Sequence, residues 1–165
     1  IEQEGTYNLP EAQLDRFLMQ VILDYPSHDE ELKIIDLEHN YTLTQKTSQE
    51  EIIEARRLIS TIYVDDKLKD YIVSMVQATR TPQLYSKELA NWIRRGASPR
   101  ASLAALHAAR AYAWLYGEKY VLPEHIQAIW HNILRHRIAL SYEAQADNIS
   151  KNQVIDALLR VVAIP

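Results

Sequence analysis

Apolar residues recur three or four positions apart through most of the chain after residue 47, and this spacing places them on one face of a helix. Pro123 opens one such run, which extends to residue 141, and a short helix is expected within residues 83–95. Most other runs follow a residue that can cap a helix, namely Ser48, Asp65, Ser98 or Ser150. The pattern predicts a compact bundle of four or five helices.

The first 45 residues have a different pattern, in which helical and extended segments alternate. Pro10 opens a short helix, and the apolar, β-branched residues 18–25 predict a buried strand. A capping box of Ser27 and Glu30 then starts a second helix. Such alternation is typical of the trailing edge of an α/β domain.

A polar stretch, residues 40–47, separates the two patterns and predicts a domain boundary. We expect one unit over residues 1–45 and a helical domain over residues 46–165, so the chain is mainly α-helical with a short α/β remnant in front. The chain begins at Ile1 without a methionine, and its opening residues read as the middle of a sequence. We therefore expect a piece of a longer protein.

The best-defined helix start lies in "RRGASPRASLAALHAARAYAWLYG". Ser98 can cap this helix, Pro99 suits its first position, and Gly117 can end it. Arg100 is unexpected there, because a cation in the first turn opposes the helix dipole at a cost of roughly 0.3–1 kcal/mol. Two interpretations stay open: Arg100 pairs with a carboxylate or faces water, or it receives an anion such as phosphate at the helix N-terminus.

The composition argues against several kinds of site. The 165 residues include no cysteine, so disulfides and thiolate metal sites are excluded, and the net charge of −4 argues against nucleic-acid binding. No apolar run approaches the roughly 20 residues that span a bilayer, so no membrane span is expected. Three histidines, His125, His131 and His136, share a predicted helix but do not share one face of it, and we expect no metal site.

Two arginines remain as candidates for chemistry. Arg16 lies near the end of the first short helix, directly before the predicted strand. It is placed either to pair with Asp15 or Glu11 or to present its guanidinium to a neighbouring subunit. Arg100 keeps its two interpretations. The basic run at residues 135–137, by contrast, is expected near a helix C-terminus on grounds of stability alone.

Several segments together resemble the MoxR family of AAA+ ATPases. They are "IEQEGTYNLPEAQLDRF", "ATRTP", "GASPRASLAALHAARAYAWLYGEKYVLPEHI", "ILRHRIALSYEA" and "VVAIP", and they span almost the whole chain in the family's order and spacing. The resemblance implies that residues 1–45 end the AAA+ nucleotide-binding core and that residues 46–165 form the helical lid. Leu122 departs from the family, because a capping Thr or Ser often stands there.

The resemblance also implies an activity for the longer protein. ATP with Mg²⁺ would be bound and hydrolysed in a cytoplasmic ring, expected to be a hexamer, which remodels or matures client proteins. The Walker A and Walker B motifs would lie upstream, and no GxxxxGK(S/T) motif occurs in this chain. We therefore expect that this chain alone neither binds nucleotide tightly nor hydrolyses ATP, and that it binds no nucleic acid.

Two site residues follow from the resemblance. The family's arginine finger falls on Arg16, which would reach the ATP site of the adjacent subunit and stabilise charge on the γ-phosphate. Its sensor 2 arginine falls on Arg100, which would contact the nucleotide phosphates and couple the ATP state to the position of the lid. Whether Arg100 acts in its own subunit or in a neighbour's is left open.

Two other functions stay open as alternatives. The first is a non-enzymatic helical interaction module, which an apolar surface patch together with arginines buried in internal ion pairs would favour. The second is a helix-turn-helix DNA binder, against which the acidic balance of the chain argues.

Overall fold

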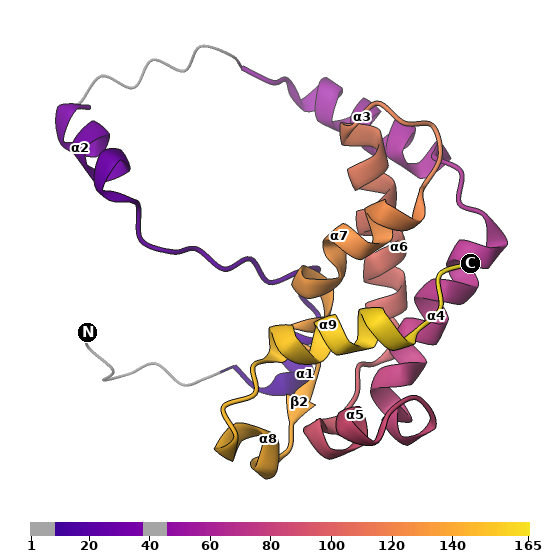
Figure 1. Ribbon diagram of the computed structural model, residues 1–165. Coiled ribbons are helices and arrows are strands. Elements are labelled where there is room, and N and C mark those ends of the chain that lie inside the picture. Colours follow the sequence, from indigo (N-terminus) through magenta and orange to yellow (C-terminus); the bar gives the residue numbers. More distant parts are fainter. Residues whose placement is uncertain (1–8, 38–45) are drawn as a thin grey trace.

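The computed structural model describes residues 9–37 and 46–165 of the chain. Helix α6, Pro99–Leu115, stands at the centre of the bundle (Figure 1), where it packs against α3 (Gln49–Thr61), α4 (Asp66–Arg80) and α7 (Pro123–Leu134). The buried residues of α6 are all alanines, whose small side chains let the neighbouring helices approach closely. The mainly helical fold class is confirmed.

Helix α9, Lys151–Val161, packs against α4 and α7. Side chains from these three helices meet in the core, where Met75, Trp130 and Leu158 have no exposed surface. Burial of a large apolar side chain contributes roughly 1.5–3 kcal/mol. The large residues of α4, α7 and α9 therefore supply much of the stability of the bundle around the alanine face of α6.

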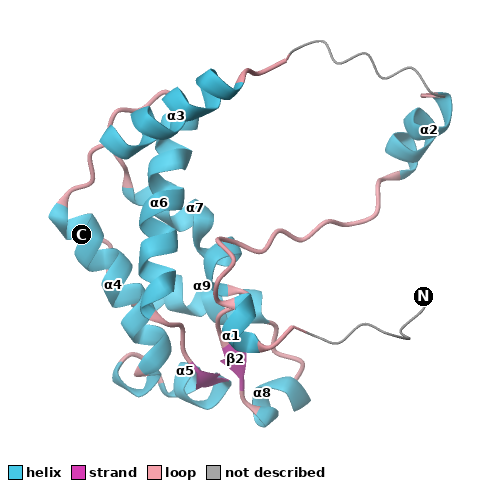
Figure 2. Ribbon diagram, turned by 180° about the vertical axis from the view of Figure 1, so that it is seen from behind, coloured by secondary structure: helices cyan, strands magenta, loops and turns pink. Residues whose placement is uncertain are grey.

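A small antiparallel sheet joins two segments that lie far apart in the sequence. Strand β1, Ile93–Arg95, pairs with β2, Ala139–Leu140, and Ile93 lies opposite Leu140 (magenta in Figure 2). This pairing places the segment before α6 beside the segment after α7. The short elements nearby are η1 (Pro82–Leu84), α5 (Lys87–Trp92) and α8 (Tyr142–Ala146).

The helix starts predicted from capping residues are confirmed. Each predicted cap accepts a hydrogen bond from a backbone N–H in the first turn of its helix, as seen for Ser48, Asp65, Ser98 and Ser150. Helix α4 ends at Arg80, just before Thr81 and Pro82, because a proline disfavours helical backbone in the residue before it.

Helix α7 is shorter than its sequence pattern predicted. It ends at Leu134 instead of continuing toward residue 141, because the chain there extends to form β2. Its start is capped in an unexpected way. Leu122 has no side-chain acceptor, but its backbone N–H donates to Nδ1 of His125 at 3.1 Å.

The described residues before the bundle contain two helices joined by an extended segment. Helix α1, Glu11–Leu14, lies close to the bundle, whereas α2, His28–Asp36, stands apart from it in both views (Figures 1 and 2). The start of α2 after Ser27 is confirmed, where Glu30 accepts from the Ser27 backbone N–H at 2.8 Å but no backbone N–H that the structure describes donates to the Ser27 side chain. The strand predicted over residues 18–25 does not form. A strand needs a neighbouring strand to pair its backbone groups, and none lies beside this segment among the described residues.

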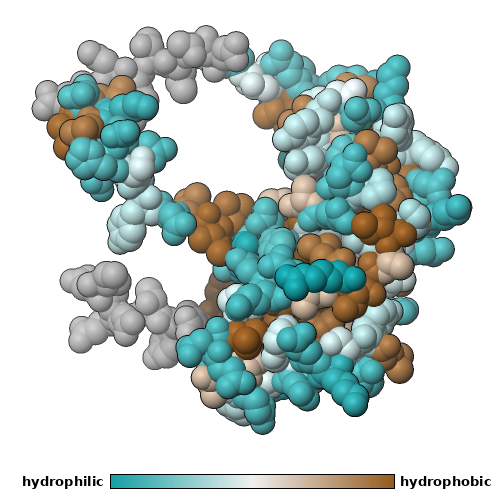
Figure 3. Space-filling view, in the orientation of Figure 1, coloured by the Kyte–Doolittle hydropathy of each residue, from teal (hydrophilic) through white to brown (hydrophobic). Residues whose placement is uncertain are grey.

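The extended segment leaves its apolar side chains in solvent. Leu23 is 88% exposed and Tyr25 is 93% exposed, and Figure 3 shows brown, apolar residues along the chain between the bundle and α2. The predicted domain boundary near residue 45 falls within residues 38–45, which lie outside the described residues.

Candidate functional site

The two candidate arginines belong to one junction, where the end of α1 meets the N-terminus of α6. Arg16 directly follows Asp15, the C-cap residue of α1, and Arg100 lies in the first turn of α6. Nη1 of Arg100 is 3.5 Å from Oδ2 of Asp15. The fold thus brings together two arginines that the sequence placed in different predicted domains.

Asp15 is the shared partner at this junction. Its Oδ2 accepts a hydrogen bond of 2.8 Å from the Ser98 hydroxyl and lies beside Arg100, while its Oδ1 accepts one of 3.3 Å from Nε of Arg137. The carboxylate also lies at the positive end of the α6 dipole, which favours an anion. It therefore offsets the cost of a cation in the first turn. The carboxylate-pairing interpretation of Arg100 describes this structure.

Arg137 holds the loop that carries Arg16. Only 2% of the Arg137 side chain is exposed. Besides Asp15 Oδ1, its guanidinium donates to four backbone carbonyls, those of Asp15, Phe17, Leu18 and Ile133. A guanidinium has five N–H donors in a planar fork, and all five are used here. Burial lowers the pKa of Arg137, and the nearby Asp15 charge opposes that change.

His136 binds the same loop from the next position. Its Nε2 lies 3.2 Å from the carbonyl oxygen of Phe17, and since a carbonyl only accepts, this nitrogen carries the donated proton. Burial, together with the charge of Arg137, lowers the pKa of His136. The imidazole is therefore neutral at pH 7 and adds a hydrogen bond rather than a charge.

Arg135 completes the contact between the loop and the end of α7. Its Nη1 donates to the carbonyl of Gln20 at 3.0 Å, and the Gln20 N–H donates to the carbonyl of Asn132 at 2.8 Å. The basic run 135–137 was assigned to helix stability alone, and Arg137 does bind the last turn of α7. That assignment was incomplete, because all three side chains also hold residues 15–20, which we call the finger loop.

The start of α6 is fixed from its other side by the end of α4. The Ala97 N–H donates to Oγ1 of Thr79 at 2.9 Å, and the Ala97 carbonyl accepts from Nε of Arg80 at 2.6 Å. A Cβ atom on Gly96 would lie 2.3 Å from the backbone oxygen of Thr79, so only glycine fits this close approach. The turn before α6 is therefore closely fitted against α4.

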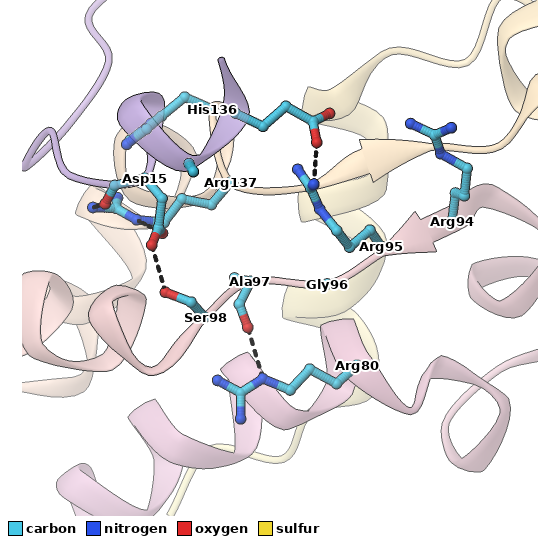
Figure 4. Close-up of a pocket in the computed structure, with 11 residues that line it drawn as sticks. Asp15, Arg80, Arg94, Arg95, Gly96, Ala97, Ser98, His136 and Arg137 are labelled. Carbon is cyan, nitrogen blue, oxygen red and sulfur yellow. Dashed lines mark hydrogen bonds and ion pairs between the residues drawn. The ribbon is translucent and has the colours of Figure 1, made fainter.

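A pocket of about 530 Å³ opens beside the junction, bordered by α1, the end of α4 and β1. Figure 4 shows Arg80 reaching the Ala97 carbonyl across the turn, and Asp15 between Ser98 and Arg137. The charged side chains that line the pocket are Glu11, Asp15, Arg80, Arg94, Arg95 and Arg137. Arg16 and Arg100 are not among its lining residues.

The side chain of Arg16 is exposed, and both of its expected internal partners are engaged elsewhere. Asp15 is bound by Arg137, and Glu11 pairs with Arg95. Among the described residues, no hydrogen bond or ion pair involves the Arg16 guanidinium. Of the two interpretations of Arg16, the internal salt bridge is therefore absent from the described part of the chain.

Sequence reasoning did not identify Asp15 and Arg137 as site residues. Asp15 was considered only as a partner for its neighbour, and Arg137 only as a helix-end cation. The two lie 122 positions apart, so no local pattern relates them. The only available signal was that an arginine directly before an extended segment needs something to hold its loop in place.

Neither a metal cluster nor a membrane helix is found in the described residues. No three or more His, Cys, Asp or Glu side chains within residues 9–37 and 46–165 are placed to hold a metal ion. None of the helices in this part of the chain combines the length and apolar character needed to cross a membrane.

Comparisons with known proteins agree on one family. Residues 90–158 match the AAA lid domain. Over its full length the chain is 41% identical to chaperone MoxR1 of Mycobacterium tuberculosis and 31% identical to protein MoxR of Paracoccus denitrificans, covering 45% and 53% of these proteins. The whole chain also superposes, with a TM-score of 0.92 and 40% identity, on 52% of a Cytophaga hutchinsonii protein described as a "putative ATPase". The chain thus spans about half the length of the curated relatives it matches.

Proposed function

This chain belongs to the MoxR family of AAA+ ATPases and corresponds to the C-terminal half of its relatives, and we propose that it supplies two arginines to ATP sites in a ring. In this proposal residues 1–45 complete the nucleotide-binding core, and residues 46–165 form the lid. The complete protein, expected to be a cytoplasmic hexamer, uses ATP and Mg²⁺ to remodel or mature client proteins.

The first proposed residue is Arg16, which acts as an arginine finger at the ATP site of the neighbouring subunit. Hydrolysis spreads negative charge over the γ-phosphate oxygens, and a guanidinium delivered to them stabilises that charge. Fingers of this kind contribute about 10³–10⁵ to the rate in well-studied phosphoryl-transfer systems. Such a residue must be exposed and free of internal partners, and the described contacts of Arg16 meet that need.

The second proposed residue is Arg100, which contacts nucleotide phosphates as sensor 2. Its side chain is 55% exposed at the N-terminus of a helix of 17 residues. The helix dipole at such a terminus favours an anion, and the Arg100 guanidinium adds a planar fork of donors. A bound nucleotide would bring its anionic phosphates to this cationic helix start. The junction is not suited to hold Mg²⁺, because its carboxylate, Asp15, is already bound by Ser98, Arg100 and Arg137.

One observation carries the proposal. The end of α7 holds the finger loop by its backbone carbonyls and by Asp15, and it leaves the Arg16 guanidinium in solvent. A loop bound so closely around one exposed cation is the arrangement expected where that cation serves a site outside its own chain.

The test of Arg16 uses the full-length protein. Replacing Arg16 with alanine is expected to lower ATP turnover by about 10³-fold, while affinity for a non-hydrolysable ATP analogue stays within about two-fold. Steady-state hydrolysis and titration calorimetry measure the two quantities. Arg160→Ala is the matched control, since Arg160 is exposed on α9, and it should change neither. Equal losses of binding and turnover in Arg16→Ala would assign Arg16 a structural role.

Mixing two inactive proteins tests whether the finger acts between subunits. Arg16→Ala subunits keep an intact ATP site, and subunits with a disabled Walker B acid keep an intact finger. Co-assembly is expected to restore activity at the interfaces that combine the two intact parts. Restoration would not occur if the finger served the ATP site of its own subunit.

The alternative, a non-enzymatic interaction module, would be favoured by an apolar surface patch together with arginines buried in internal ion pairs. Arg16 and Arg100 are both exposed, so this feature is not met. Apolar residues are exposed between α1 and α2, but in the proposal they adjoin the remainder of the core.

A further inference from the structure

Asp15 links the two arginines of the proposed function within one chain. Its carboxylate contacts Arg100, and the next residue along the backbone is Arg16. The same carboxylate is bound by Ser98 and Arg137. Any event that changes the partners of Asp15 therefore acts one residue away from the proposed finger.

The two arginine partners of Asp15 differ in how readily they are exchanged. Arg137 is buried and uses every donor, so breaking its contact would leave a charge without a partner in the interior. Arg100 lies 3.5 Å from Asp15 with 55% of its side chain exposed, and an ion pair of that kind contributes little stability. Arg137 is thus the fixed partner, and Arg100 is the exchangeable one.

A nucleotide phosphate competes directly with Asp15 for Arg100. Both are anions favoured at the N-terminus of α6, and arginine binds phosphate through two parallel hydrogen bonds. When Arg100 turns to a phosphate, Oδ2 of Asp15 loses its cation, whereas Oδ1 keeps Arg137. The carboxylate is then held by Arg137 and Ser98 alone, and Arg16 is joined directly to it through the backbone.

We propose that Asp15 is a positioning residue that couples phosphate binding at Arg100 to the placement of Arg16. This rests on the proposed function, because it takes Arg100 as a phosphate contact and Arg16 as the finger. Without nucleotide, Arg100 pairs with Asp15. With nucleotide, the release of Asp15 sets the finger loop for hydrolysis in the neighbouring subunit.

The variant that tests the coupling is Asp15→Asn in the full-length protein. Asparagine keeps the shape of the side chain and an oxygen that accepts from Ser98 or Arg137, but it has no charge to hold Arg100. Affinity for a non-hydrolysable ATP analogue is expected to rise about two- to five-fold, the range given by an exposed ion pair. Turnover is expected to fall about 10- to 100-fold, because asparagine has an NH₂ group where Ser98 or Arg137 needs an acceptor, and a finger loop displaced by about 1 Å loses its alignment.

Two companion variants isolate the effect. Asp156→Asn removes a carboxylate that pairs with His131 across α7 and α9, away from the junction, and it should leave affinity and turnover unchanged. In an Arg100→Ala background, Asp15→Asn should no longer raise affinity, because the cation that it releases is absent. A merely structural role for Asp15 would produce neither the opposite changes nor this dependence on Arg100.

The outcomes separate the coupling from the proposed function. Unchanged affinity in Asp15→Asn, or a parallel loss of affinity, turnover and thermal stability, would overturn the coupling. The proposed function fails on a different result, namely wild-type turnover in Arg16→Ala. The affinity response to Asp15→Asn depends on Arg100 alone, so it can be measured whatever the finger variant does.

Discussion

Burial separates the two arginines that contact Asp15 and decides what each can do. Arg137 is enclosed, and its five hydrogen bonds tie residues 15–18 to the last turn of α7. Arg100 touches the same carboxylate from the surface and keeps most of its hydration. A charge surrounded by fixed acceptors stabilises a structure, whereas a charge near water stays available to a ligand.

Replacing Arg137 with methionine is expected to destabilise the chain by about 2–4 kcal/mol. The apolar side chain leaves the Asp15 carboxylate and three finger-loop carbonyls without their donor, and a broken buried pair costs more than a missing surface contact. Urea unfolding of the chain, with its midpoint and slope, measures the loss. Arg57→Met is the control, since Arg57 forms an exposed pair with Glu54 on α3 and should cost less than about 1 kcal/mol. Similar losses in the two variants would contradict the role given to Arg137.

At the scale of elements, the sequence predicts the helix starts, which depend on nearby residues, but not the strands, which need a partner far away in the sequence. Caps such as Ser48 and Ser98 depend on neighbours within four residues, and they were found. Strand β1 was not expected, because its partner β2 lies more than 40 positions away. The strand expected over residues 18–25 fails for the same reason, since the described residues offer it no pairing edge.

In the candidate site, too, residues in contiguous motifs could be predicted, whereas contacts between distant segments could not. Arg16 and Arg100 were identified because their motifs are contiguous in the sequence. The loop contacts of Arg137 could not be identified, since they depend on which chain segment lies against the end of α7. The need for glycine at position 96 could not be identified either, because it comes from the close approach of Thr79 on α4.

Gly96→Ala is expected to destabilise the bundle by about 1–3 kcal/mol or more, the usual range for forcing an extra carbon into a packed site. The added Cβ meets backbone on α4, which cannot rotate away, so the Ala97 contacts with Thr79 and Arg80 must stretch. Thermal unfolding measures the loss, and hydrogen exchange at the Ala97 amide locates it. Gly117→Ala offers a comparison, because Gly117 has a φ of 78° but open space around it. A smaller loss for Gly96→Ala than for Gly117→Ala would refute the steric argument.

At the scale of the whole molecule, the chain has a well-packed helical bundle and, between α1 and α2, a segment whose apolar side chains are exposed. From α4 to α9 the apolar residues share one core, whereas the segment between α1 and α2 buries none of its apolar side chains fully. Exposed apolar runs of this kind usually mark a surface that meets another part of a protein. The relatives are about twice as long as this chain, so the remainder of the AAA+ core is the partner that we expect there.

Joining the chain to the remaining half of its full-length protein should therefore protect the backbone of residues 18–25. In the chain alone these amides face solvent, apart from contacts such as the Gln20 bond to Asn132, and Leu23 should exchange its amide hydrogen within seconds. If the segment becomes a strand of the core sheet, its amides gain partners and exchange slows by at least about 10³-fold, as is typical of core strands. Amides in α9 serve as the internal control, since they belong to the bundle in both proteins and should exchange alike. Equally fast exchange of residues 18–25 in both proteins would show that this segment stays uncovered, and the finger loop would then depend for its position on the end of α7 and on Ser98.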